Sequence, residues 1–146
     1  MSDILFKPEL TPKQMLDMGV FGGWYFGDYG GVPDDLPDDW FTDAKIATSG
    51  FDAHLNHFGV AAGQDRDVWI AKGWITPQDP LGWFQWYCRY TLGRRLAGVD
   101  AFQIKRWKAF GARHRPQVIK NCDPGDVFCR PRQRQALLQW AYDPLI

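Results

Sequence analysis

Hydrophobic residues recur every three or four positions along most of the chain, which is the spacing of amphipathic helices. The first such segment is 11–19, where Thr11 is a good N-cap, Pro12 suits the first turn and Gly19 suits the end. The same spacing predicts further helices over residues 55–62, 65–73, 81–92, 100–110, 116–121 and 131–142. The residues expected to begin or end some of these helices are Asp65, Gly73, Asp79, Asp100 and Pro131.

The segment 81–92 is apolar almost all round when it is wound as a helix. Only Gln85 and Arg89, four residues apart on one stripe, interrupt it. A helix that is apolar on every side is normally buried in the middle of a domain. We therefore predict that 81–92 is the central helix and that the other helices pack around it.

Residues 19–31 combine frequent glycine with aromatic side chains. Glycine at this density disfavours a helix, whereas the aromatic rings need a surface to pack against. We expect a loop or short hairpin that covers one side of the core. The predicted fold class is mainly α, with a single compact domain over residues 1–146 and short helices around a central aromatic-rich helix.

The composition is that of a packed globule, with 45% apolar residues, 16% aromatic residues and eight tryptophans in 146 positions. Each buried Trp or Phe removes about 150–250 Å² from water, so the core needs no metal or disulfide. No apolar run approaches the ~20 residues of a membrane span, and residues 1–8 do not resemble a secretory signal. Three sparse cysteines suit a reducing compartment. These features predict a cytoplasmic protein without a membrane partner.

The formal net charge is zero, but the two halves of the chain differ. Through Ile70 there are twelve acidic and four basic residues, and from Ala71 onward there are five acidic and thirteen basic residues. In one interpretation the halves fold against each other and neutralise locally. In the other, a basic face of the second half meets an anionic partner. Zero net charge argues against strong non-specific binding of nucleic acid, but not against a local basic groove.

Several functional classes lack their sequence signals. The glycine-rich segment has neither the Gly-Lys-Ser/Thr ending of a P-loop nor the glycine spacing of a dinucleotide fold. With only two serines and no nucleophile elbow, serine-hydrolase chemistry is disfavoured. No RNA-recognition signature, zinc-finger spacing or helix-turn-helix pattern is present. The sequence implies no cofactor.

Two groups of residues could bind a metal ion. His54 and His57 would share one face of a helix, and Cys122, Cys129 or an aspartate could complete a zinc site. The six residues between the two cysteines exceed the usual spacing. The alternative is ordinary surface or hydrogen-bonded histidines. Oxygen ligands for a hard cation occur in the acidic loop, at Asp34, Asp35, Asp38 and Asp39, but without EF-hand spacing.

The arginines are the most informative polar residues. Arg89 interrupts the central helix, and Arg134 lies on the expected inner face of the last helix. A guanidinium is almost never fully buried unless it is paired. These arginines therefore either hold aspartates of the same chain or converge with Trp and Tyr on a site for an anion, where guanidinium groups grip phosphate or carboxylate and rings stack.

Three functional hypotheses follow. In the first, the chain binds a phosphate-bearing or otherwise anionic ligand, nucleic acid included, through contacts at Arg89, Arg94, Arg95, Arg106, Arg130, Arg132 and Arg134, with Trp107 as a stacking partner. In the second, it is a small enzyme whose acid-base group is Asp79, Asp28 or His57 beside Arg89, in an aromatic pocket. In the third, excess aromatic surface makes it a protein-interaction or self-associating module.

Overall fold

The computed structural model describes residues 6–27, 30–63 and 66–146. This part of the chain contains no β-strand, and its α-helices are α2 (Pro12–Met18), α3 (Arg66–Ala71), α4 (Trp83–Thr91), α5 (Ala97–Asn121) and α6 (Pro131–Gln139). The single-turn 3-10 helices are η1 (Phe21–Gly23), η3 (Asp38–Phe41) and η4 (Ala53–Leu55). The mainly α fold class is thus confirmed.

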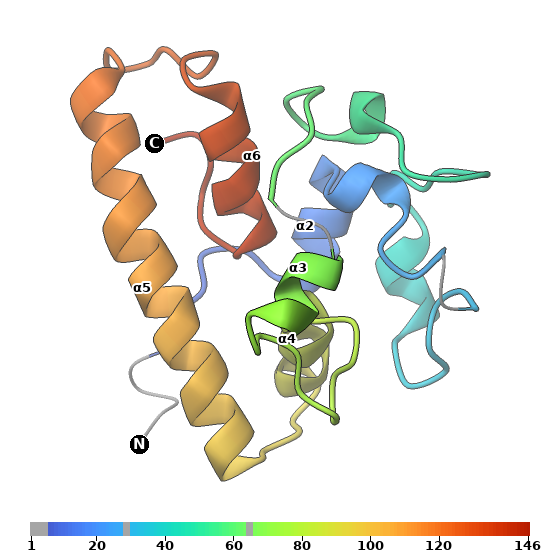
Figure 1. Cartoon of the computed structure of the whole chain (residues 1–146). Helices are drawn as coiled ribbons and strands as arrows, with labels where there is room; N and C mark the ends of the chain where they lie inside the picture. The colour runs from blue at the N-terminus through green and yellow to red at the C-terminus, as the bar shows by residue number, and fades with distance from the viewer. Residues whose placement is uncertain (1–5, 28–29, 64–65) are drawn as a thin grey trace.

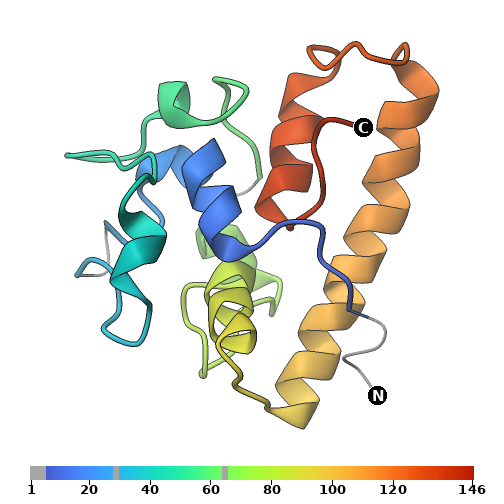
Figure 2. The same ribbon diagram turned by 180° about the vertical axis from the view of Figure 1, so that it is seen from behind.

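Helices α5 and α6 form an antiparallel hairpin, and α4 lies beside it in the middle of the molecule (Figures 1 and 2). Helix α2 contacts α4 from the other side. Loops between residues 20 and 62 form the side of the molecule away from α5 (Figure 1). The arrangement gives α4 neighbours on most sides, as the predicted central helix requires.

Helix α4 is the centre of the aromatic core. Its residues from Trp83 to Cys88 are all buried, and Cys88 is fully enclosed. The Phe6 ring packs at centroid distances of 4.9–6.3 Å on five rings, those of Trp83, Trp86, Tyr87, Tyr90 and Trp107. Rings that pack edge to face in this way add to the free energy gained from burial alone.

The described residues of the segment 19–31 cover another side of α4, as we expected of a loop that packs on the core. Phe21, Tyr25 and Phe26 pack on Phe84 with ring centroids 5.1, 5.2 and 6.4 Å away. The Tyr25 hydroxyl donates to the Leu81 carbonyl at 2.6 Å and accepts the backbone N–H of Gln85 at 3.2 Å. Tyr25 therefore holds the beginning of α4 in place.

The helix predicted over 55–62 is wrong. In its place are η4 and a series of turns, with Gly59 at a φ of 69°. The buried Asn56 side chain explains this, because it accepts the N–H of Gly22 at 2.8 Å and donates to the Val60 carbonyl at 2.8 Å. Asparagine competes with helical hydrogen bonding in this manner when a distant backbone group is in reach.

The helices predicted over 100–110 and 116–121 are one helix, α5, which continues through Pro116. An internal proline removes one backbone hydrogen bond and crowds the preceding turn. Packing on both sides of Pro116 offsets this cost. Val118 is fully buried, and Gly111 lies so close to Tyr142 that an added Cβ would come within 2.2 Å of its hydroxyl.

Two aspartates predicted as N-caps have other partners. The N-cap of α4 is Gly82, while Asp79 binds arginines. The N-cap of α5 is Leu96, and Asp100 lies inside the first turn, where it accepts the Leu96 N–H at 2.9 Å and the Trp86 indole N–H at 2.8 Å. Both predictions of a cap are wrong. The Asp79 carboxylate binds two guanidinium groups instead, whereas Asp100 lies one turn further into its helix than a cap residue would and still accepts the N–H of the residue at the N-cap.

Other boundaries follow the sequence signals. Thr11 and Gln14 form a reciprocal capping box at α2, and Gly19 ends that helix. Pro131 opens α6. That helix ends at Gln139, earlier than expected, and Ala141 then adopts a φ of 61°. The predicted cap Asp65 lies outside the described residues.

Candidate functional site

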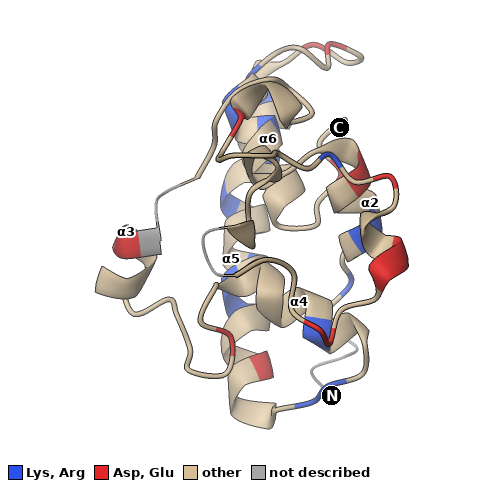
Figure 3. Ribbon diagram, turned by 90° about the vertical axis from the view of Figure 1, so that its right-hand side faces the viewer, with Lys and Arg blue, Asp and Glu red and all other residues tan. Residues whose placement is uncertain are grey.

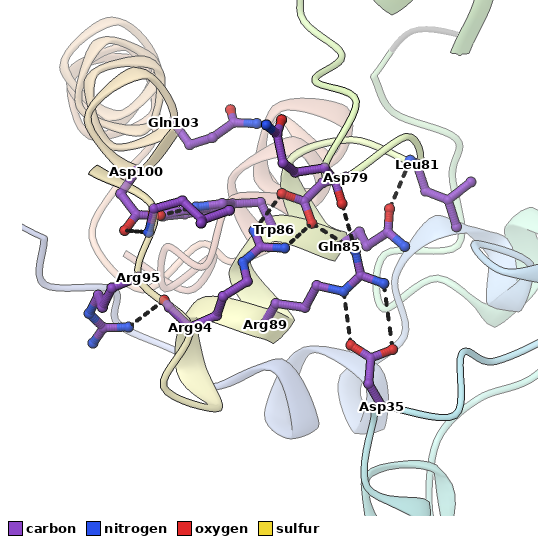
Figure 4. A network of polar contacts seen from close by, with 12 residues as sticks. Asp35, Asp79, Leu81, Gln85, Trp86, Arg89, Arg94, Arg95, Asp100 and Gln103 are labelled. Atoms are coloured by element: carbon purple, nitrogen blue, oxygen red, sulfur yellow. Dashed lines mark hydrogen bonds and ion pairs between the residues drawn. The ribbon is translucent and has the colours of Figure 1, made fainter. Parts of the chain in front are cut away.

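The predicted ligand arginines Arg89 and Arg94 bind a carboxylate of the same chain. Asp79 is fully buried, and its oxygens accept both outer nitrogens of Arg94, at 2.9 and 2.6 Å, and one nitrogen of Arg89 at 3.1 Å (Figure 4). Asp35 binds the other side of Arg89 at 2.9 Å. This hydrogen bond and the positive charge of Arg89 lower the pKa of Asp35.

This cluster joins the acidic and basic halves of the chain. Asp35 comes from the N-terminal loops and Arg89 from α4. Acidic residues of the N-terminal half lie on α2, α3 and loops, whereas basic residues recur along α5 (Figure 3). Local neutralisation therefore accounts for Arg89 and Arg94, and on α5 for Arg115, which lies 3.8 Å from Glu9. No other basic residue of α5 forms an ion pair with a described carboxylate.

Arg134 is fully buried and is held by backbone oxygens. Its guanidinium donates to Asp126 at 2.8 Å, Pro144 at 2.8 Å, Ile146 at 2.9 Å and Cys129 at 2.5 Å. The four acceptors belong to the α5–α6 connection and to the last residues of the chain. Arg134 thus ties these two segments together and faces inward, as the sequence pattern predicted.

The other residues predicted to bind a ligand do not gather in one place. Arg95 donates to the carbonyls of Tyr90 and Arg94 and lies 3.6 Å above the Tyr90 ring. Arg130 donates to Gln133, and Arg132 is exposed. Trp107 is buried and stacks on Tyr142 with centroids 4.9 Å apart, so its ring faces a neighbour within the core.

Of the alternative acid-base groups, Asp79 lies beside Arg89, at 3.1 Å, and His57 forms no hydrogen bond with Arg89 among the described residues. Asp79 is enclosed by its arginines, and His57 is exposed with its ring against Phe58. Asp28 lies outside the described residues.

The candidate metal ligands are also separated. Cys122 and Cys129 form a disulfide across the α5–α6 connection, and His54 is bound by Asp52 at 3.2 Å. Within the described ranges, no three side chains from His, Cys, Asp and Glu gather as a metal site would require.

Sequence reasoning missed a cavity of about 640 Å³ between α3, α4, α5 and α6. Half of the tryptophans line it, and they are Trp69, Trp74, Trp83 and Trp140. The other aromatic residues in its wall are Phe21, Tyr25, Phe84 and Phe110. Its basic residues are Lys72, Arg106, Arg113 and His114, and none of its described lining residues is Asp or Glu. The cavity therefore combines an aromatic wall with an excess of positive charge.

Arg106 is the polar centre of this cavity. One guanidinium nitrogen donates to the Trp74 carbonyl at 3.1 Å and to the Gln103 side-chain oxygen at 2.9 Å. The central guanidinium carbon, Cζ, lies 5.2 Å from the ring centroids of both Trp74 and Trp140. No carboxylate of the described residues forms an ion pair with it. Burial without a counter-charge lowers the pKa of Arg106 to about 10, so the group is charged at neutral pH.

Helix α5 supplies one wall of the cavity through Arg106, Ala109, Phe110, Arg113 and His114. These residues follow the spacing that places side chains on one face of a helix. The sequence thus contained a signal for this wall, because Arg106, Phe110 and His114 recur every four residues. The opposite wall comes from α3, α4 and α6, whose approach to α5 depends on the tertiary fold.

The electrostatics around His114 predict a pH-dependent stability. Burial, and then the neighbouring Arg113, lower the pKa of His114 below its ordinary value of 6.5. The unfolded chain therefore takes up this proton at a higher pH than the folded chain does, so stability is lost as pH falls below 6.5. In urea unfolding at pH 7.5 and 5.5, His114→Phe should show a smaller loss than the wild type. The exposed His57→Phe should keep the full loss, and an unchanged loss in His114→Phe would contradict the assignment.

Comparisons with protein families, curated proteins and solved structures gave no match for this chain. Its helices within the described ranges are all too short or too polar to cross a membrane.

Proposed function

We propose that the chain binds a small planar anion, an aromatic compound bearing a carboxylate or phosphate, in the cavity around Arg106. One observation carries this proposal. The Arg106 guanidinium is partly buried among aromatic side chains and has no carboxylate partner among the described residues. A charge removed from water is unfavourable unless it is paired. The two nearby indole rings offset part of this cost through cation–π attraction, and an anionic ligand would supply the missing charge.

The hydrogen bonds that Arg106 already forms leave one edge of its guanidinium for contact with an anion. Nη1 is used by Trp74 and Gln103, whereas Nη2 and Nε have no partner in the described part of the chain. These two nitrogens form the edge of a guanidinium that binds carboxylate or phosphate in a bidentate manner. Lys72 and Arg113 add positive charge at the cavity wall.

The cavity has the size and character of a small-molecule site. Such sites have volumes of roughly 300–1,000 Å³ and are mostly apolar, with a few convergent polar groups. The volume of about 640 Å³ lies in that range, and four tryptophans give flat surfaces for a ring. The described lining contains no Asp or Glu, so no carboxylate in it would repel an anion or attract a cation.

The alternatives have less support. For nucleic acid, Arg89, Arg94 and Arg134 are engaged within the chain. For an enzyme, the described candidates Asp79 and His57 do not line the cavity. For self-association, the support is limited to exposed apolar residues such as Phe128, at 83% exposure. A DNA resin that retains the protein with a steep salt dependence would favour the nucleic-acid alternative.

A cytoplasmic location stays a prediction. It came from the number of cysteines, and the bond between Cys122 and Cys129 now argues against it, because disulfides persist mainly in oxidising compartments. The proposed binding does not depend on the compartment.

The proposal is tested with two probes of the same shape, 2-naphthoate and the neutral 2-naphthalenemethanol, by quenching of tryptophan fluorescence. A charge-assisted hydrogen-bonded contact contributes about 1.5–3 kcal/mol, so the anion should bind roughly tenfold to a hundredfold more tightly. Arg106→Gln should abolish this preference. Lys108→Gln makes the same charge change at an exposed position on the same helix and should keep it. Equal affinities for the two probes in the wild type would contradict the proposal.

A further inference from the structure

A second, smaller cavity adjoins the aromatic one. Its volume is about 360 Å³, and it shares Gly63, His114 and Ala136 with the lining of the larger cavity. Arg132 and Gln133 line only the smaller cavity. His114 therefore lies where the two spaces meet.

The amide of Gln133 has a fixed orientation. Its oxygen accepts Arg130 at 3.0 Å, and a guanidinium can only donate. The amide nitrogen must then face the other partners, Gln117 at 2.7 Å and His114 Nδ1 at 2.9 Å. Gln133 consequently uses its two N–H groups as donors, one of them toward the imidazole.

This donor determines the tautomer of His114. Because Nδ1 accepts the Gln133 N–H, the proton of the neutral ring is on Nε2. The ring is also held by Phe110, whose centroid is 4.2 Å away. Nε2–H has no hydrogen-bond partner in the described part of the chain, and the ring lines both cavities.

The distance between Arg106 and His114 along α5 sets the length of a ligand that could contact both side chains. Arg106 and His114 are eight residues apart, which is a rise of about 12 Å along a helix. Phe110 lies between them on the same face and stacks on Trp140 at 4.9 Å. A bicyclic ring over Phe110 and Trp140 would have one end near each polar group.

We infer that the ligand carries a second hydrogen-bond acceptor at the end opposite its anionic group, and that His114 selects it by donating from Nε2. This inference rests on the proposed function. It narrows the ligand class to elongated planar anions with acceptors at both ends. Gln133 is a positioning residue, because it acts only through the ring of His114.

The tautomer is measured first, without ligand, from long-range proton–nitrogen NMR spectra of the ¹⁵N-labelled wild type above pH 7. We expect His114 as the Nε2–H tautomer. In Gln133→Leu we expect a mixture of tautomers, since the donor to Nδ1 is lost. A ring protonated on Nδ1 in the wild type would overturn the inference even if every variant failed to fold.

Binding is then compared for 6-acetyl-2-naphthoate and 6-isopropyl-2-naphthoate, which have the same shape but differ in the acceptor. One neutral hydrogen bond corresponds to roughly a threefold to tenfold tighter binding of the acetyl compound. His114→Phe should remove this difference between the acetyl and isopropyl compounds, whichever way it changes the affinity for both. If 2-naphthoate binds the wild type but the acetyl and isopropyl compounds bind equally, the inference fails and the proposed function stands. If no naphthoate binds, both fail.

Discussion

Replacing Asp79 by asparagine should lower the free energy of unfolding by about 3–5 kcal/mol, the cost of removing one partner from a buried ion pair. Asp79 is the fully buried carboxylate that neutralises Arg94 and contributes to neutralising Arg89. Asparagine keeps the shape but loses the charge. It also places an N–H₂ group against one of the two Arg94 nitrogens, so a donor faces a donor.

The control for this prediction is Asp35→Asn, the same chemical change in the same cluster. The Asp35 side chain is 50% exposed, and exposed ion pairs contribute only about 0–1 kcal/mol. Urea unfolding of both variants and the wild type gives the comparison. Equal, small effects from the two variants would show that Asp79 is not the centre of this cluster.

Arg134→Met should destabilise the protein to a similar extent, by about 3–5 kcal/mol, because a buried acceptor left without its donor costs about 1–3 kcal/mol and several are affected. Methionine fills the space of the arginine stem but donates no hydrogen bond. The oxygens of Asp126, Cys129, Pro144 and Ile146 would each lose their donor. Buried acceptors without a partner are unfavourable, so the ends of the α5–α6 connection and of the chain should separate.

Arg132→Met is the matched control, since Arg132 is exposed on the same helix. It should change the unfolding midpoint little, whereas Arg134→Lys should be nearly as unstable as Arg134→Met because one ammonium group cannot reach four acceptors in a planar array. The measurement is urea unfolding without reductant, so that the bond between Cys122 and Cys129 persists. A stable Arg134→Met variant would refute the role assigned to this guanidinium.

Local signals in the sequence predicted the elements whose ends are satisfied locally. Helix α2 follows from Thr11, Gln14 and Gly19, which are all within a few residues of the hydrogen bonds they govern. The central position of α4 follows from its apolar circumference, because a helix that is apolar all round must be covered.

Prediction failed where a distant residue decided the local structure. Asn56 bonds to Gly22, and this contact replaced the helix expected over 55–62. Packing of Val118 and Gly111 carried α5 through Pro116. Such contacts join positions that the spacing of hydrophobic residues does not relate to each other.

The sequence singled out the arginines but not the cavity that Arg106 lines. The sequence indicated that inward-facing arginines would hold either an internal partner or an external one, and three of the predicted arginines have internal partners. Arg89 and Arg94 have Asp79, and Arg134 has backbone oxygens. Arg106 has neither a carboxylate nor full burial, and it was predicted together with Trp107 when its actual neighbours are Trp74 and Trp140.

The most direct test of the account is a crystal structure of the protein with 2-naphthoate. We expect the ring between the aromatic walls of the larger cavity, with its carboxylate within hydrogen-bonding distance, about 3 Å, of Nη2 and Nε of Arg106. Two results would contradict the claim that Arg106 binds the anionic group of a ligand. One is a ring bound in that cavity with its carboxylate turned to solvent, and the other is a naphthoate bound only outside the cavity.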